Sequence, residues 1–140
     1  PEVAKPVAVY VPAVRSGNHV FTSGQLPMRS GELITTGKVG GEVTEEEAVE
    51  CARQCALNGL AAIRAELGSL SDIKRIVKVV AFVASTPDFT GQPQVANGVS
   101  ELLGDVFGEA GQHARSAVGV PVLPLDAPVE VEVIAEVLGA

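Results

Sequence analysis

Residues 129 to 137 alternate between small apolar and mostly acidic side chains, and this alternation constrains the fold more than any other feature. One set of alternate positions contains Val129, Val131, Val133, Ala135 and Val137. The other set contains Glu130, Glu132, Ile134 and Glu136. Successive side chains of a strand point to opposite faces of a sheet. The segment therefore predicts a strand whose valine face lies on helices, and whose glutamate face is turned toward solvent or a neighbouring subunit.

Two other segments have the periodicity of amphipathic helices that can cover the valine face. The first begins at Thr44, where Thr44 and Glu47 have the spacing of a capping box, and Gly68 is its expected C-cap. The second covers residues 93–107 and is closed by residues 108–111.

Further strands are expected at residues 7–14, 19–23, 33–36, 76–84 and 114–120. The first two are expected to form a hairpin across Ser16, Gly17 and Asn18. The order of elements predicts one α+β domain over residues 1–140, a sandwich with two helices packed on one face of a mixed sheet. Both faces of the strand at 76–84 are largely apolar, so a partner subunit is the expected cover for the face away from the helices.

Composition excludes several classes of function. Aromatic residues make up 4% of the 140 positions, tryptophan is absent and the net charge is −7, which argues against a nucleic-acid surface. No run of 18 apolar residues is present, so no membrane partner is expected. Cys51 and Cys55 lie four apart on one helical stripe, which indicates core packing, a reducing compartment and a cytoplasmic protein. Zinc needs about four ligands, and no metal site is expected.

Arg115 is the candidate ligand-binding residue. It shares one face of the strand at 114–120 with His113 and Ala117, and that face is expected to point away from the helices. There the guanidinium would meet Glu130 or Glu132. Arginine binds carboxylates through two parallel hydrogen bonds, which indicates a small anionic ligand. A structural salt bridge at an interface is the alternative interpretation, and it is favoured when these residues are considered alone.

Ser23 and Gly24 form a second candidate. They supply a hydroxyl and a backbone amide at the end of an expected strand, a combination that can hold an anion or a substrate oxygen. An ordinary strand exit explains the same residues.

Three segments together resemble the RidA family, also called YjgF or L-PSP endoribonuclease-like. They are Phe21-Thr-Ser-Gly-Gln-Leu-Pro, Asp72-Ile-Lys-Arg-Ile-Val-Lys-Val-Val-Ala-Phe-Val, and His113-Ala-Arg-Ser-Ala-Val-Gly-Val-Pro-Val-Leu-Pro followed by Val129-Glu-Val-Glu-Val-Ile-Ala. The similarity extends from about Tyr10 to Val137. It implies a chorismate-mutase-like fold and a homotrimer, whose sheets form a central barrel with a pocket at each subunit interface.

The resemblance also assigns roles to residues. It implies that Arg115 binds a substrate carboxylate, that Glu130 orients the attacking water, and that no cofactor is needed. The pocket residues implied in the same way are Tyr10, Ser23, Gly24 and Asn97. Ala117 stands where many members have cysteine, and the segments 87–94 and 108–113 also depart from the family pattern.

Three functions remain open. The first is hydrolysis of reactive enamines or imines to 2-keto acids and ammonia. The second is a regulatory trimer that binds a 2-keto acid without turnover. The third is the endoribonuclease activity of the family's older name, which an acidic chain without a basic groove disfavours.

Overall fold

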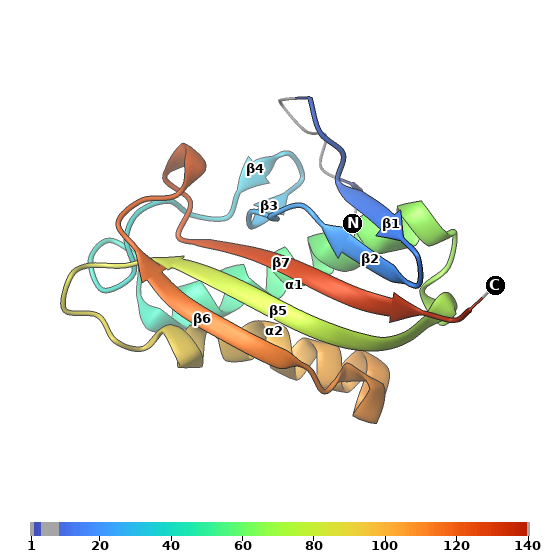
Figure 1. Ribbon diagram of the computed structural model, residues 1–140. Coiled ribbons are helices and arrows are strands. Elements are labelled where there is room, and N and C mark those ends of the chain that lie inside the picture. Colours follow the sequence, from blue (N-terminus) through green and yellow to red (C-terminus); the bar gives the residue numbers. More distant parts are fainter. Residues whose placement is uncertain (1, 4–8, 140) are drawn as a thin grey trace.

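A five-stranded sheet with two long helices on one face forms the body of the computed structural model, which describes residues 2–3 and 9–139 (Figure 1). The strands and helices are β1 (Ala13–Ser16), β2 (His19–Thr22), β3 (Met28–Arg29), β4 (Glu32–Leu33), α1 (Glu45–Leu67), β5 (Ile73–Ala84), α2 (Gln92–Phe107), β6 (Ala114–Val120) and β7 (Val129–Val137). Single turns of 3-10 helix lie at Leu70–Asp72, Gly108–Gly111 and Pro124–Asp126.

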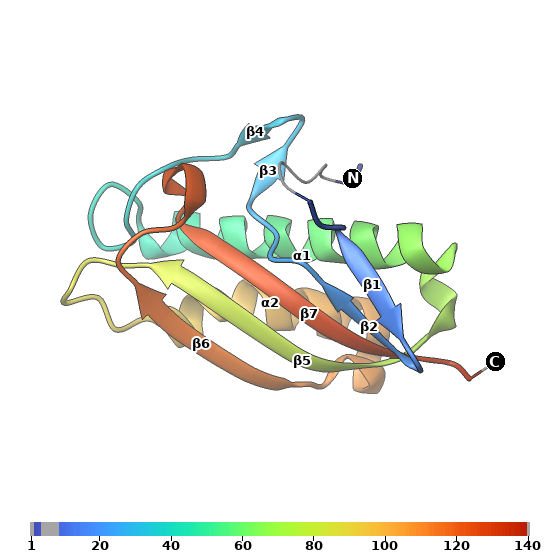
Figure 2. The ribbon, with the colours of Figure 1, turned by 45° about the horizontal axis from the view of Figure 1, so that its top comes forward.

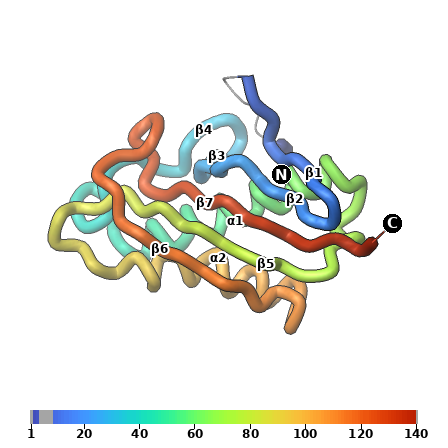
Figure 3. Tube along the Cα trace, in the orientation of Figure 1, coloured from blue at the N-terminus to red at the C-terminus, as the bar shows by residue number. Residues whose placement is uncertain are grey.

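The sheet is mixed, as the order of elements predicts. Its strand order is β1-β2-β7-β5-β6, which can be followed along the chain in Figure 3. β5 and β6 are parallel and are joined through α2, whereas the other neighbours are antiparallel. A parallel pair needs such a crossover because the second strand must begin at the same end of the sheet as the first. β6 is the last strand in the order and therefore forms one edge of the sheet, next to α2.

β7 has the predicted division between its faces. Val129, Val131, Val133, Ala135 and Val137 are each at most 2% exposed. The glutamates that alternate with them are only partly buried and lie on the face away from the helices. The two helices lie together on the valine side, as Figure 2 shows.

Both predicted ends of α1 are confirmed. The Thr44 Oγ1 accepts from the Glu47 amide at 3.1 Å, and the Glu47 carboxylate accepts from the Thr44 amide at 3.0 Å. Gly68 ends the helix with φ 90°, a conformation that glycine adopts without a steric penalty. α2 begins at Gln92, one residue before the expected start.

The strand predictions were less accurate at the N-terminus. Residues 7 and 8 lie outside the described residues, and β1 begins only at Ala13, so residues 9–12 are not a strand. The strand expected at 33–36 is shorter and begins at Glu32, where it pairs with Met28–Arg29, a segment expected to be a loop. Ser30 and Gly31 both have positive φ, which closes a tight two-residue hairpin that the apolar pattern does not indicate.

β5 begins at Ile73, three residues before the expected start. Its pairing with β7 shifts register between Ile73 and Arg75 and again between Ile76 and Lys78. These irregularities place Ile76 on the buried face together with Val79. Strict alternation had put Ile76 on the opposite face, and that assignment was wrong because a bulge changes the parity of a strand.

The face of the sheet away from the helices is rich in apolar groups. Phe21 is 41% exposed, and Val14 and Val118 are also exposed. Val80 and Phe82 of β5 lie on the same face and are partly exposed. Phe82 also packs against a small cluster that contains Leu123 and Ala127, whereas Phe21, Val14 and Val118 remain exposed. Exposed apolar surface of this kind is typical of an interaction site.

The close contact of the two helices depends on Gly98. A Cβ at this position of α2 would collide with the backbone carbonyl of Val49 in α1, which cannot move aside as a side chain can. Gly104 lies further along the same helix, and a Cβ there meets no other atom within 4 Å.

We therefore expect Gly98→Ala to lower the free energy of unfolding by about 1–3 kcal/mol through overpacking. Gly104→Ala is the matched control, and it should stabilise the protein by up to about 1 kcal/mol because alanine restricts the unfolded chain. Urea denaturation of the two variants measures both values. Equal effects of the two substitutions would contradict the close helix contact.

Candidate functional site

Arg115 lies on the helix-covered face of the sheet, contrary to the sequence prediction. It pairs in register with Val79, which is fully buried beneath the helices. Its Nη1 donates to the Asn97 Oδ1 at 2.8 Å and to the Ser100 Oγ at 3.2 Å, both on α2. Asn97, which the resemblance implies as a pocket residue, is thus in direct contact with Arg115.

The expected meeting of Arg115 with Glu130 or Glu132 inside one chain is wrong. Glu130 pairs with Phe82 and Glu132 with Val80, on the open face of the sheet. Alternation shows which residues of a strand share a face, but the register against β5 decides which face that is. Here the less apolar side of β6 is turned toward α2.

A chain of hydrogen bonds extends from Arg115 through Ser100 to His113. The Ser100 Oγ lies 2.8 Å from the His113 Nε2, and the His113 Nδ1 lies 2.6 Å from the Gly111 carbonyl oxygen. These groups border a hollow of about 320 Å³ lined by Ser100, Gly104, Gly111, Gln112, His113 and Arg115.

Sequence analysis did not identify Ser100. The available signal was its position three residues after Asn97, which places both side chains on one side of α2. Sequence analysis placed His113 on the same strand face as Arg115, where it could support the site, and the structure connects it to Arg115 through one hydroxyl.

Glu130 and Gly24 form a second cluster, on the open face. A Cβ at Gly24 would overlap the Glu130 carboxylate, so any larger residue would require this side chain to move. Phe21 pairs with Ile134, and Gln25 pairs with Val131. Between these two pairs the chain advances four residues after β2 but only three along β7. This extra residue is a β-bulge, and it brings the Gly24 backbone against the carboxylate.

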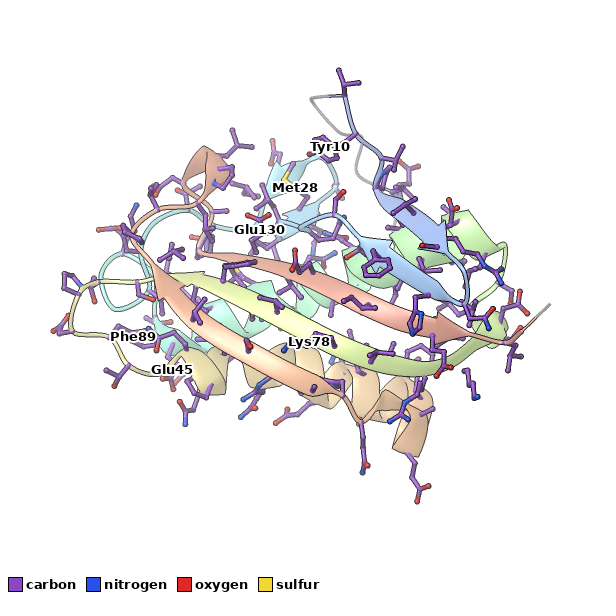
Figure 4. All side chains as sticks on the ribbon, in the orientation of Figure 1. Tyr10, Met28, Glu45, Lys78, Phe89 and Glu130 are labelled. Atoms are coloured by element: carbon purple, nitrogen blue, oxygen red, sulfur yellow. The ribbon has the colours of Figure 1, made fainter. Side chains whose placement is uncertain are left out.

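Ser23 and Tyr10 lie on the N-terminal side of this cluster. The Ser23 Oγ donates to the Val11 carbonyl at 2.6 Å, and the Ser23 amide donates to the Pro12 carbonyl at 2.8 Å. These bonds attach the segment that contains Tyr10, whose side chain is 51% exposed. In Figure 4, Tyr10 and Glu130 lie near the β3–β4 hairpin, whereas Lys78 lies on β5.

Burial raises the pKa of Glu130, and the negative charge of Glu132 raises it further. Both are strand neighbours on the same face, so their charges repel across the open surface. A carboxylate whose pKa is raised accepts a proton more readily than an ordinary carboxylate, which favours acid–base chemistry.

The two cysteines do not form a site. Burial raises the pKa of Cys51 to about 11, and burial also raises the pKa of Cys55. Both thiols are buried in the core beneath the sheet. Among the described residues, no group of three or more His, Cys, Asp or Glu side chains could hold a metal ion.

The candidate residues thus form two clusters on opposite faces of one sheet. Arg115 and Asn97 lie between β6 and α2, whereas Glu130 and Gly24 lie on the open face. The sheet separates them, so one chain cannot bring both clusters to the same ligand. No helix in the described part of the chain is long and apolar enough to cross a membrane.

Comparison with known proteins defines the class. Residues 1–137 match the model of the family described as "YjgF/chorismate mutase-like, putative endoribonuclease". The chain belongs to this family, which is the RidA family expected from the three sequence segments.

Individual relatives cover nearly the whole chain. Protein TCP17 of Trypanosoma cruzi is 46% identical over 137 residues, which are 97% of this chain and 86% of that protein. The 2-iminobutanoate/2-iminopropanoate deaminase of Dermatophagoides farinae is 34% identical over 134 residues, covering 94% and 88% of the two chains. The crystal structure of Atu1372 from Agrobacterium tumefaciens, a protein of unknown function, superposes with a TM-score of 0.90 at 49% identity, covering 91% and 82%.

The environment of Glu130 makes a prediction about stability and pH. The pKa of Glu130 is higher in the folded than in the unfolded state. Ionisation of this carboxyl at neutral pH therefore lowers the free energy of unfolding. Glu130→Gln should therefore raise the free energy of unfolding near pH 7. The gain should shrink as the pH falls through the raised pKa, and vanish below about pH 4, where both states of the wild type are protonated.

Urea denaturation at a series of pH values measures this difference. Glu132→Gln is the matched control, because it removes only the neighbouring charge, the lesser of the two causes. A Glu130→Gln gain that is constant across the pH range would show that the carboxyl is not desolvated.

Proposed function

We propose that the protein hydrolyses reactive enamines or imines to 2-keto acids and ammonia, in pockets between the subunits of a homotrimer. The observation that carries the proposal is the separation of the Arg115 cluster from the Glu130 cluster by the sheet. Two copies of the chain can bring them together, with Arg115 from one copy and Glu130 from its neighbour. The uncovered apolar face, with Phe21 and Val118 exposed, supports such an assembly.

In this proposal Arg115 binds the substrate carboxylate. Both N–H groups of Nη1 are used by Asn97 and Ser100, which leaves the Nε and Nη2 edge for two parallel hydrogen bonds to a carboxylate. This grip holds the adjacent imine carbon at a fixed position, and positioning of this kind can supply much of a rate enhancement.

Glu130 then acts on water. Its carboxylate takes a proton from water as the water oxygen bonds to the imine carbon, and returns it to the imine nitrogen, which gives a neutral tetrahedral carbinolamine. The carboxylate then transfers the hydroxyl proton of the carbinolamine to the same nitrogen, the C–N bond breaks, and ammonia leaves as the carbonyl group of the 2-keto acid forms. The raised pKa of Glu130 suits both halves of this transfer. Water is the only co-reactant that the balance requires.

The deaminase from Dermatophagoides farinae supports this choice of reaction, since 94% of this chain aligns with it. Binding of a 2-keto acid without turnover is the second candidate, and the alanine at position 117, beside the arginine, favours it because it adds no reactive group to the pocket. Endoribonuclease activity is disfavoured, because the net charge of −7 and the two neighbouring carboxylates of Glu130 and Glu132 on the open face would repel phosphates. A cytoplasmic location belongs to the proposal, on the basis of the two free thiols.

Arg115→Ala is expected to lower kcat/KM for iminopropionate about 100-fold, because hydrogen bonds to a charged group contribute about 1.5–3 kcal/mol. Release of keto acid and ammonia, measured against the uncatalysed rate, tests this. Arg53→Ala removes an exposed arginine of α1, outside both clusters, and should leave the rate unchanged. A wild-type rate equal to the uncatalysed rate, with saturable keto-acid binding, would favour the second candidate.

Mixed assemblies test the shared pocket. Arg115→Ala and Glu130→Gln subunits should each be nearly inactive alone, yet trimers that contain both variants should recover about one third of the wild-type rate, because each such trimer has one intact pocket among its three. The two variants are co-expressed with different tags and purified through both. No recovery in verified mixed trimers would overturn the arrangement.

A further inference from the structure

We propose that Ser100 and His113 are a positioning pair, which fixes the direction in which Arg115 presents its guanidinium to the carboxylate. This inference rests on the proposed function and adds two residues to its site. Ser100 lies on α2 and His113 immediately precedes β6, so the pair connects the helix to the strand that contains Arg115.

The direction of every hydrogen bond in this chain follows from the acceptor at its end, the Gly111 carbonyl oxygen. The Gly111 carbonyl oxygen can only accept, so the proton of a neutral His113 lies on Nδ1, 2.6 Å away. Nε2 then has a lone pair, and the Ser100 hydroxyl donates its proton to it across 2.8 Å. The oxygen of Ser100 is left to accept from the Arg115 Nη1 at 3.2 Å. Every donor therefore points the same way, and bonds in such a chain strengthen one another.

The acceptor at the end of this chain is held rigidly. Gly111 is buried, and a Cβ there would collide with the backbone carbonyl of Leu103 in α2. The backbone of Gly111 is thus packed against the same helix that contains Ser100. A fixed acceptor sets the ring of His113, the ring sets the hydroxyl, and the hydroxyl sets one side of the guanidinium.

This arrangement decides which edge of Arg115 is open to the ligand. Asn97 and Ser100 use both protons of Nη1. The Nε and Nη2 edge makes no hydrogen bond to any residue that the structure describes, and Arg115 borders the hollow shared with Ser100 and His113. Loss of the Ser100 acceptor frees one Nη1 proton and allows the guanidinium to rotate, which weakens two-point binding of a carboxylate.

The charged surroundings of His113 come from several strands. Arg115 lies two residues after His113 in the chain. A second hollow, of about 470 Å³, is lined by His113 together with His19, Arg75 and Glu136. The test is therefore made at about pH 8, where an ordinary imidazole is neutral.

The kinetic experiment uses Ser100→Ala and His113→Leu, with Ser100→Thr and His113→Gln as controls that keep a hydroxyl and an acceptor. We expect each of the first two to raise KM for the imine, and Kd for 2-oxobutanoate, about 5–10-fold, the loss of one neutral hydrogen bond. kcat should change less than about 2-fold, since the carboxylate is bound alike in the ground state and the transition state. The controls should stay within about 2-fold of the wild type.

The double variant Ser100→Ala/His113→Leu separates positioning from general damage. Because both residues act through one contact, the double variant should be no worse than either single one. Independent, multiplying losses would overturn the inference, and so would an unchanged KM in Ser100→Ala.

A measurement without substrate keeps the inference distinct from the proposed function. Nitrogen-15 NMR of the two histidines should show the Nδ1–H tautomer for His113, with exposed His19 as the internal reference. An Nε2–H tautomer would overturn the positioning chain, even if the protein is an active deaminase. A wild type that neither binds 2-oxobutanoate nor hydrolyses imines would overturn the proposed function, and with it the carboxylate assigned to Arg115.

Discussion

Burial of the valine face of β7 is the interaction on which the rest of the structure depends. β7 lies in the middle of the sheet between β2 and β5, and its five helix-facing side chains are almost completely removed from water. Burial of each valine stabilises the fold by about 1.5–3 kcal/mol. A register slip of one residue would exchange this face for the glutamates, so the position of β7 is strongly specified.

The same alternation creates the acidic half of the site. With the valines on the helices, Glu130 has to lie on the open face, where it is partly buried and close to Glu132. The bulge after β2 then brings Gly24 against its carboxylate, and the side chain of Thr22 satisfies the Val133 amide beside the bulge at 2.9 Å. The unusual pKa of Glu130 is thus a consequence of core packing together with one extra residue in the neighbouring strand.

The basic half of the site is built differently, at the edge strand β6. No outer strand in the described part of the chain pairs with β6, so Arg115 can reach past the sheet edge to α2 and meet Asn97 and Ser100. An arginine held from one side by neutral acceptors keeps its charge available for a ligand. Because the two halves lie on opposite faces of the sheet, the active site that we propose requires two neighbouring chains, and in this proposal the apolar open face lies between them.

The sequence by itself determined the elements with a clear period or a capping signal: α1 with both ends, β6, β7, and the packing of two helices on a mixed sheet. It also identified the family, and it named both Arg115 and Glu130. It did not determine the short hairpin of β3 and β4, the bulged start of β5, or the role of Ser100. Above all, it put Arg115 on the wrong face. The alternation of a strand is a local property with two equivalent orientations, and only the register of β6 against β5, set by long-range packing, chooses between them.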